Sequence, residues 1–160
     1  MRVRKLELFA DYFQFYLQDE QASASLAEAW TEEANRRRLA VSPDGYGIGV
    51  GTARNMTVPV RVEVRARPPR DDLGPWDHVV ECSVHVPSGQ LVVAGCTDYF
   101  PDAARIDVAP GWHRARVYHG GLGSVSPDRL EGKDRYRVAL WPAPPADVEV
   151  LKQGPVDPTA

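Results

Sequence analysis

The segment Gly45–Asn55, GYGIGVGTARN, decides which fold class the sequence encodes. Its first four glycines stand at every second position, whereas a nucleotide-binding loop needs glycines at offsets of zero, two and five. The third of these offsets falls on Val50 or Thr52, depending on where the count begins, and no GK[ST] follows. A period of two is typical of a β-strand with side chains on one face and bare backbone on the other. We therefore predict a strand over Gly45–Val50, whose glycine face lets another element approach closely.

The whole chain has the composition of one globular domain. It has 160 residues, of which 43% are hydrophobic, and a formal net charge of −3. This composition argues against disorder, and the acidic balance argues against a general nucleic-acid binder. Glu7 and Asp11 interrupt what would have to be the apolar core of a signal peptide, and no apolar run could span a bilayer. We expect a soluble, cytoplasmic protein with no direct contact to nucleic acid or membrane.

Short alternating runs, separated by turn residues, follow one another along the rest of the chain. TVPVRVEVRAR (57–67) places valines on one side and Arg61, Glu63 and Arg65 on the other. Residues 5–18 fit either a helix or a strand, and their aromatic content favours a strand. One helix is predicted over 26–38, with a capping box at Ser25 and Glu28. The pattern predicts a mainly antiparallel β-sandwich of eight or nine strands with one helix, a single domain over 1–153 and a flexible tail over 154–160.

Two segments have the pattern of β-hairpins. VECSVHVPSGQLVVAGC (80–96) turns at Pro87–Gly89, and this register would place Cys82 opposite Ala94 on the buried face. Buried thiols behave as small hydrophobes, so both Cys82 and Cys96 are expected to be reduced. A second hairpin-like unit, residues 104–121, turns at Pro110–Gly111.

No motif with catalytic or metal-binding spacing is present. HExxH, CxxC, GxSxG and EF-hand patterns are missing, and the four histidines are scattered. A zinc site would require these histidines to converge in space, which their positions do not indicate. We therefore expect no enzyme activity, no cofactor and no metal, although an active site assembled only by the fold stays an open alternative.

Two acidic loops that contain aromatic residues are the candidate partner-binding site. Aromatic side chains supply buried contact area and carboxylates steer and align a partner, so this mixture suits a protein-binding surface. The alternative is that the aspartates serve turns and the aromatics close the end of the sandwich. The candidate residues are Asp71, Asp72, Trp76 and Asp77 in the first loop, and Asp98, Tyr99, Phe100 and Asp102 in the second.

Four short motifs resemble the competence protein J family in order and approximate spacing. They are YFQFYLQDE, AWTEEA, DGYGIGVGTARN and VAPGWHRARVY, and the resemblance covers mainly the first 65 residues. The known member of that family inhibits the DNA-entry nuclease of transformable bacteria. The resemblance implies a small intracellular protein that binds and blocks a nuclease, and it transfers no catalytic residue.

Three functions therefore compete. The first is a binding protein of inhibitor or immunity type, whose partner is a nuclease or a toxin protein. The second is a ligand- or glycan-binding sandwich that uses Trp76, Trp112 or Trp141 as a stacking platform. The third is an enzyme with a site formed only in the fold, which clustered titratable groups would reveal.

Overall fold

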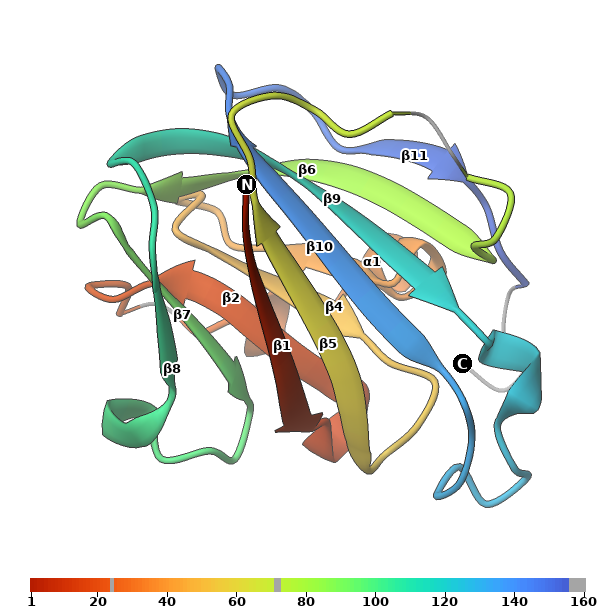
Figure 1. Cartoon of the computed structure of the whole chain (residues 1–160). Helices are drawn as coiled ribbons and strands as arrows, with labels where there is room; N and C mark the ends of the chain where they lie inside the picture. Colours follow the sequence, from red (N-terminus) through yellow and green to blue (C-terminus); the bar gives the residue numbers. More distant parts are fainter. Residues whose placement is uncertain (24, 71–72, 156–160) are drawn as a thin grey trace.

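Two β-sheets pack face to face in the computed structural model, which describes residues 1–23, 25–70 and 73–155 (Figure 1). The six-stranded sheet has the order β1 (Arg2–Phe9), β5 (Thr57–Val64), β10 (Arg135–Pro142), β9 (Gly111–Gly120), β6 (His78–Val86) and β11 (Glu149–Lys152). The five-stranded sheet has the order β3 (Leu39–Val41), β4 (Gly47–Gly51), β2 (Gln14–Asp19), β7 (Gln90–Gly95) and β8 (Ala104–Asp107).

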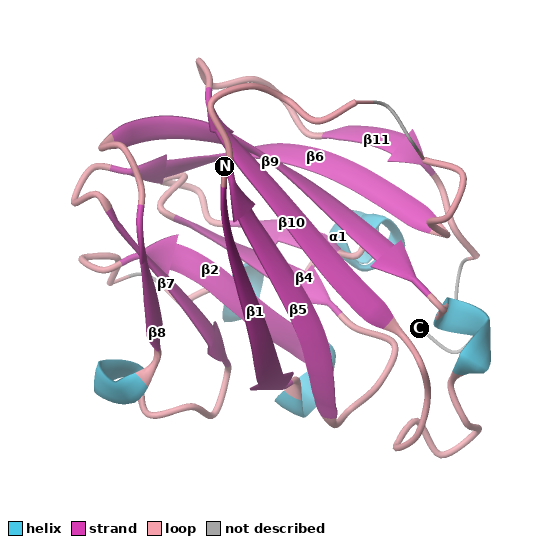
Figure 2. Cartoon of the chain, viewed as in Figure 1, coloured by secondary structure: helices cyan, strands magenta, loops and turns pink. Residues whose placement is uncertain are grey.

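The predicted mainly antiparallel sandwich is confirmed, with more strands than expected. Eleven strands lie in the described part of the chain, and among the pairings found there only β5 with β10 is parallel. Its helices are short (Figure 2). They are α1 (Glu32–Arg37) and four single 3₁₀ turns, namely η1 (Asp11–Phe13), η2 (Ala27–Ala29), η3 (Phe100–Asp102) and η4 (Leu122–Ser124).

The core lies between the two sheets and follows the alternation in the sequence. Val58, Val60 and Val62 of β5 are buried there, as predicted for the valine run. Inward-facing residues of β10, in particular Tyr136 and Leu140, join the same cluster. Neighbouring residues of a strand point to opposite faces. The arginines and glutamates that alternate with these inward-facing residues therefore lie on the outer face of the six-stranded sheet.

The glycine-rich segment forms strand β4, as predicted, although it begins two residues later. Gly45 lies in the preceding turn with a φ of +80°, which suits glycine. The glycine face is covered by an aromatic ring, because a Cβ atom on Gly49 would lie 3.0 Å from the ring of Trp30. The Trp30 indole N–H also donates to Gln14 Oε1 at 2.7 Å. Bare backbone therefore lets Trp30 pack flat on this sheet.

Residues 5–18 form two strands in different sheets, which corrects the single strand that the pattern predicted. β1 belongs to the six-stranded sheet and β2 to the five-stranded sheet. The break is the turn η1, in which Tyr12 and Phe13 adopt φ values of +58° and +59°. Period-two alternation continues on both sides of this turn, so the sequence pattern alone does not show the change of sheet.

The predicted hairpins are also wrong, although their turns are present. At the first turn, Gly89 has a φ of +73° and its N–H donates to Val86 O at 3.2 Å. The flanking strands β6 and β7 then enter opposite sheets, and Cys82 lies beside Ala115 of β9 instead of Ala94. The turn at Pro110–Gly111 likewise separates β8 from β9. A tight turn between apolar runs can link the two layers of a sandwich as well as two neighbours in one sheet.

Both cysteines are free, as predicted, but their surroundings differ. Cys82 lies in the core, where burial raises the pKa of its thiol to about 12. Cys96 follows the end of β7 and is half-buried, with Sγ 3.5 Å from Asp11 O. The expectation that both thiols share the buried face holds for Cys82 only.

The predicted helix over 26–38 is replaced by η2 and the six-residue helix α1. The Ser25 hydroxyl accepts the N–H of Ala27 at 3.1 Å just before η2, whose N-cap residue is Leu26. Thr31 is the N-cap of α1 and accepts the N–H of Ala34 at 3.1 Å. The chain leaves helical geometry near Trp30 because this residue covers the glycine face of β4.

The C-terminal segment is described as far as residue 155. The N–H of Gly154 donates to His78 Nδ1 at 3.0 Å, and Arg38 donates to Pro155 O at 2.5 Å. Residues 156–160 of the predicted tail lie outside the described residues, and the domain boundary at 153 stays a prediction. No helix in the described ranges is both long enough and apolar enough to cross a membrane.

Candidate functional site

One end of the sandwich, here called the loop end, consists of residues 9–13, 52–56, 95–102 and 121–134. Backbone hydrogen bonds tie these connections together: Ala10 N–H donates to Met56 O at 3.0 Å, and Asn55 N–H donates to Arg129 O at 2.9 Å. The contact between Cys96 and the Asp11 carbonyl brings the connection after β7 against η1. These connections lie at the lower rim of the molecule in Figure 2. Loops that a rigid scaffold positions in this way commonly carry function.

The turn η1 exposes two aromatic residues in a strained backbone conformation. Tyr12 and Phe13 both have positive φ values, and their exposed fractions are 69% and 41%. Bulky residues rarely adopt this region, at a cost of roughly 1–3 kcal/mol each, and such strain gathers at functional sites. Exposed aromatic surface gains little for the isolated fold, so this turn is a candidate contact surface.

The second predicted acidic loop belongs to the loop end. Asp98 Oδ2 accepts the N–H of Gly95 at 2.8 Å and therefore serves the turn, while Tyr99 is 70% exposed. Phe100 is half-buried beneath the Arg105 guanidinium, which lies 5.3 Å from the ring centroid, and Asp102 is exposed. Tyr99 and Asp102 thus remain available to a partner beside η1.

The first predicted acidic loop lies at the opposite side of this end. Asp77 Oδ2 accepts the N–H of Leu122 at 2.9 Å, and Trp76 packs on Tyr118 with ring centroids 5.3 Å apart. Asp71 and Asp72 lie outside the described residues. The structure therefore does not place Trp76 and Asp77 beside the loop at residues 98–102, because the connections 9–13, 52–56 and 121–134 form a continuous chain of contacts between them.

A buried ion pair fixes the connection at residues 121–134 to its neighbour. Arg54 Nε lies 2.6 Å from Asp134 Oδ1, and the Tyr136 hydroxyl donates to Asp134 Oδ2 at 2.6 Å. Burial and the neighbouring Asp134 carboxylate raise the pKa of Tyr136 well above its usual value. Asp134 is therefore a structural group that holds the loop end together.

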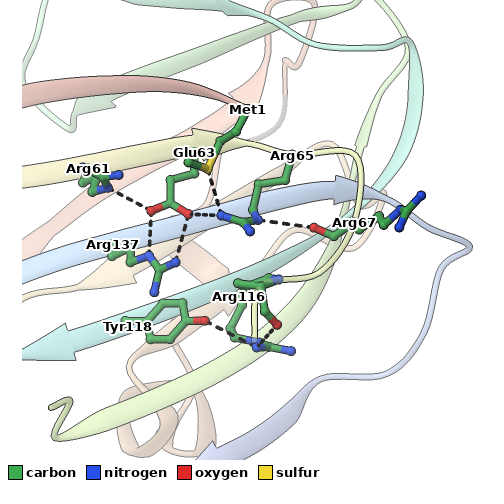
Figure 3. Close-up of polar contacts among 9 residues, drawn as sticks. Met1, Arg61, Glu63, Arg65, Arg67, Arg116, Tyr118 and Arg137 are labelled. Carbon is green, nitrogen blue, oxygen red and sulfur yellow. Dashed lines mark hydrogen bonds and ion pairs between the residues drawn. The ribbon is translucent and has the colours of Figure 1, made fainter. Parts of the chain in front are cut away.

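The outer face of the six-stranded sheet carries a buried carboxylate among arginines (Figure 3). Glu63 on β5 accepts from Arg61 Nε at 2.8 Å, from Arg65 Nη1 at 2.9 Å, and from Arg137 Nε and Nη2 at 2.8 and 2.9 Å. Burial alone would raise the pKa of Glu63, but the bonds from Arg137, Arg61 and Arg65 outweigh it and lower the pKa to about 2. Glu63 is thus ionised at every ordinary pH.

Aromatic rings and guanidinium groups alternate beside this carboxylate. Arg135 lies 4.5 Å above the ring of Trp76, and Arg137 lies 4.5 Å above Tyr118. A shallow hollow of about 550 Å³ opens next to them. Its outer-face lining is Lys5, Glu7, Pro59, Arg61, Glu63, Trp76, Arg135 and Arg137.

Sequence reasoning missed both the aromatic turn and this hollow. Alternation correctly directed Arg61, Glu63 and Arg65 outward, but it could not show that Arg137 of a distant strand meets them. The motif DYF at residues 11–13 was predicted to be part of one continuous strand over residues 5–18. In this run, aromatic residues occupy both odd and even positions, whereas a half-buried strand has its apolar residues on one face only. This difference is the signal that could have located the turn.

The other tryptophans considered as stacking platforms are covered by protein groups. Trp112 stacks on His85 at 4.5 Å and fills the space beside Gly45, where a Cβ would lie 2.6 Å from its ring. Trp141 is buried, with Arg116 5.4 Å from its ring centroid. In the described part of the chain, no three His, Cys, Asp or Glu side chains are grouped so that they could hold a metal ion.

The fold belongs to a class of two-sheet β-sandwiches that solved structures share. ComJ from Bacillus subtilis, described as an inhibitor of the DNA degrading activity of NucA, is similar with a TM-score of 0.65. The likeness covers 89% of this chain and 96% of that one at 14% identity. The protein of crocagin biosynthetic gene J is similar with a TM-score of 0.61 and 19% identity, over 89% and 98% of the two chains. No protein-family model and no curated protein sequence matches the chain. The likenesses show a common fold.

Proposed function

We propose that this chain is a binding protein without catalytic activity, which inhibits a metal-dependent nuclease by protein–protein association. The observation that carries the proposal is the strained, exposed turn Tyr12–Phe13 at the same loop end as the exposed Tyr99 and Asp102, joined to their loop through the contact of Cys96 with the Asp11 carbonyl. The fold likeness to ComJ, itself an inhibitor of a DNA-degrading activity, supports the choice of a nuclease as the partner.

The chemistry of the loop end suits such a partner. A nuclease holds DNA phosphates with basic side chains, and these can be met by carboxylates of an inhibitor. Asp102 supplies an exposed carboxylate, while Tyr12, Phe13 and Tyr99 supply aromatic contact area that a binding site needs at its centre. The partner would therefore present apolar surface opposite the aromatic side chains, with cationic side chains around it.

The first acidic loop is proposed as a second, peripheral contact. Asp77 can add steering charge at this end of the molecule and Trp76 can add aromatic contact area, while Asp71 and Asp72, which lie outside the described residues, are proposed to add negative charge to the same contact. Because the loop lies on the far side of residues 121–134, a partner would have to span the whole end to reach both loops. Changing Asp71 and Asp72 to Asn is expected to slow association and to change the dissociation rate little.

A DNA-cleavage assay tests the proposal directly. The purified chain is added to each nuclease encoded by the source genome, and binding is followed in parallel by surface plasmon resonance. We expect stoichiometric inhibition of one nuclease. Tyr12→Ala and Tyr99→Ala should each speed dissociation, because a central aromatic anchor contributes roughly 2 kcal/mol or more.

Val150→Ala is the matched control, because Val150 is an exposed apolar residue of β11 at the other edge of the six-stranded sheet. It should leave inhibition unchanged. Unimpeded cleavage at large molar excess for every such nuclease, without measurable binding, would overturn the inhibitor proposal. Inhibition that Tyr12→Ala and Tyr99→Ala leave intact would reject the loop end as the binding site.

A further inference from the structure

A row of three cations crosses the outer face of the six-stranded sheet. Lys5 of β1 lies opposite Arg61 of β5, and Arg61 lies opposite Arg137 of β10. Like charges directly opposite each other on neighbouring strands destabilise a sheet. Glu63 compensates this repulsion in part, but it is shared among three guanidinium groups. The row therefore keeps an excess of positive charge on a chain whose net charge is negative.

Several donors in this row, and Arg135 beside it on β10, have no carboxylate partner in the described residues. Within residues 1–23, 25–70 and 73–155, neither Lys5 nor Arg135 forms an ion pair, and Arg61 reaches Glu63 through Nε alone. Arg135 is held in place by the ring of Trp76 and by a hydrogen bond to Pro75 O at 3.1 Å. The ammonium group of Lys5 and the terminal nitrogens of Arg61 are thus free to contact an anion beside a pre-positioned Arg135.

The hollow between these cations also has an apolar surface. Pro59 lies opposite Glu7 and two residues before Arg61 on β5, and its exposed ring and the side chain of Trp76 contribute non-polar surface to the lining. A volume of about 550 Å³ lies within the range of small-molecule sites. Inorganic anions alone would leave this apolar surface uncovered, so an anion with an apolar body fits better.

We propose that the hollow lined by Lys5, Pro59, Arg61, Trp76 and Arg135 binds a small organic anion with a flat apolar body. Its anionic group, a carboxylate in the simplest case, contacts Lys5, Arg61 and Arg135. Its apolar body lies on Pro59 and Trp76. Glu63 holds Arg61, and the Trp76 ring and Pro75 O hold Arg135, so two of the three binding groups are fixed before the ligand arrives. This site shares Trp76 with the proposed peripheral contact, but it does not rest on the proposed inhibition.

Isothermal titration calorimetry with naphthoate tests the proposal on the full chain. We expect saturable binding with a submillimolar dissociation constant. The neutral isostere naphthamide and inorganic phosphate should each bind at least about tenfold more weakly, because one lacks the charge and the other the apolar body. Nitrogen–proton correlation NMR should show the Trp76 indole signal moving with naphthoate concentration.

Variants locate the site. Lys5→Gln should weaken naphthoate binding by about tenfold, and this variant leaves the fold intact since Lys5 has no ion-pair partner in the described residues. Arg36→Gln, the same charge change on exposed α1, is the matched control and should not alter binding. Equal binding of naphthamide and naphthoate, equal binding of phosphate, or an unchanged affinity in Lys5→Gln would overturn the proposal.

Discussion

The outer face of the six-stranded sheet and the loop end use charged and aromatic residues in opposite ways. On the outer face, Glu63 is buried and bound by three arginines, and the aromatic rings lie beneath guanidinium groups. At the loop end, Tyr12 and Tyr99 are exposed in turns, one of them with a strained backbone. On the outer face, the charged and aromatic side chains hold one another in place through their contacts. At the loop end, the exposed side chains contribute little to the stability of the fold.

This difference shows that a protein with a small net charge can still gather side chains of one sign on one face. The chain carries a formal charge of −3, yet Lys5, Arg61 and Arg137 stand side by side on one sheet. Arguments from total charge address solubility and non-specific association, and not the character of one face. The two regions can therefore favour partners of opposite charge.

The largest effect is expected from Glu63→Gln. Removing the charge leaves Arg61, Arg65 and Arg137 close together without a carboxylate, and breaking a buried ion pair in this way costs about 3 kcal/mol or more. Urea denaturation should show the loss as a lower midpoint with an unchanged slope.

Glu7→Gln is the control on the same sheet. Glu7 is exposed on β1 and forms no ion pair in the described ranges, so its change should stay within about 0.5 kcal/mol. Equal stability of Glu63→Gln and Glu7→Gln would show that the arginine cluster contributes nothing and would remove the contrast between the regions.

A smaller change in the free energy of unfolding is expected when the pH is varied, because each titration changes the charge of a single group. Glu63 has an ordinary pKa of 4.5 when unfolded and about 2 when folded, so its contribution is complete above pH 4.5 and is lost as the pH falls through about 2. Unfolding followed between pH 6 and pH 2 (roughly, the acid range of carboxyl groups) should show this loss in the native sequence and not in Glu63→Gln.

His119 should make folding stability depend on pH in a higher range than Glu63 does. Burial, followed by the nearby His78 and Arg38, lowers its pKa well below 6.5, and its two ring nitrogens have no hydrogen-bond partner among the residues that the structure describes. The unfolded chain takes up a proton near pH 6.5 while the folded chain does not, so stability falls as the pH drops below this value. His119→Leu should flatten this part of the curve, and an unchanged slope would contradict the assignment.

The sequence predicted the layers of the fold because alternation is a local property. Gly47–Gly51, the valines of β5 and the inward residues of β10 could be placed from period two alone. The partners of β6 and β7 could not, since a turn at Pro87–Gly89 fits both a hairpin and a link between sheets. That choice depends on contacts of β6 with β9, which lies 25 or more residues further along the chain.

The candidate site could be predicted only in part, for the same reason. Tyr99 and Asp102 were found because aspartates and aromatics mix in one short loop. Tyr12 and Phe13 were missed, since the left-handed backbone that exposes them results from the change of sheet between β1 and β2. The hollow was missed because its cations come from three strands that are separated in sequence.

The strain at η1 can be tested with Tyr12→Gly. Glycine adopts positive φ without the Cβ penalty, and Tyr12 is exposed, so this change should stabilise the fold by about 1 kcal/mol. The same variant should weaken binding to the proposed partner, because it removes an exposed aromatic anchor. Opposite effects on stability and binding are expected, since strained functional residues commonly reduce stability. Thermal unfolding measures the first effect and surface plasmon resonance the second. A loss of stability would mean that the Tyr12 ring packs for the fold, and the loop end would then resemble the outer face.

The smallest effect on stability, and the sharpest separation of the two regions, is expected from Asp102→Asn. Asp102 is exposed at the end of η3 and forms no ion pair in the described part of the chain, so the free energy of unfolding should change by less than about 0.5 kcal/mol. Its carboxylate should still raise the association rate with a cationic partner at low salt, and this advantage should vanish as added salt shortens screening to about 10 Å at 0.1 M. Asp98→Ala differs in a defined way, because it removes the acceptor of the Gly95 N–H, and this loss should cost stability as well. If Asp102→Asn associates as fast as the native chain at low salt, charge at the loop end does not steer the partner, and the aromatic turn alone must account for binding.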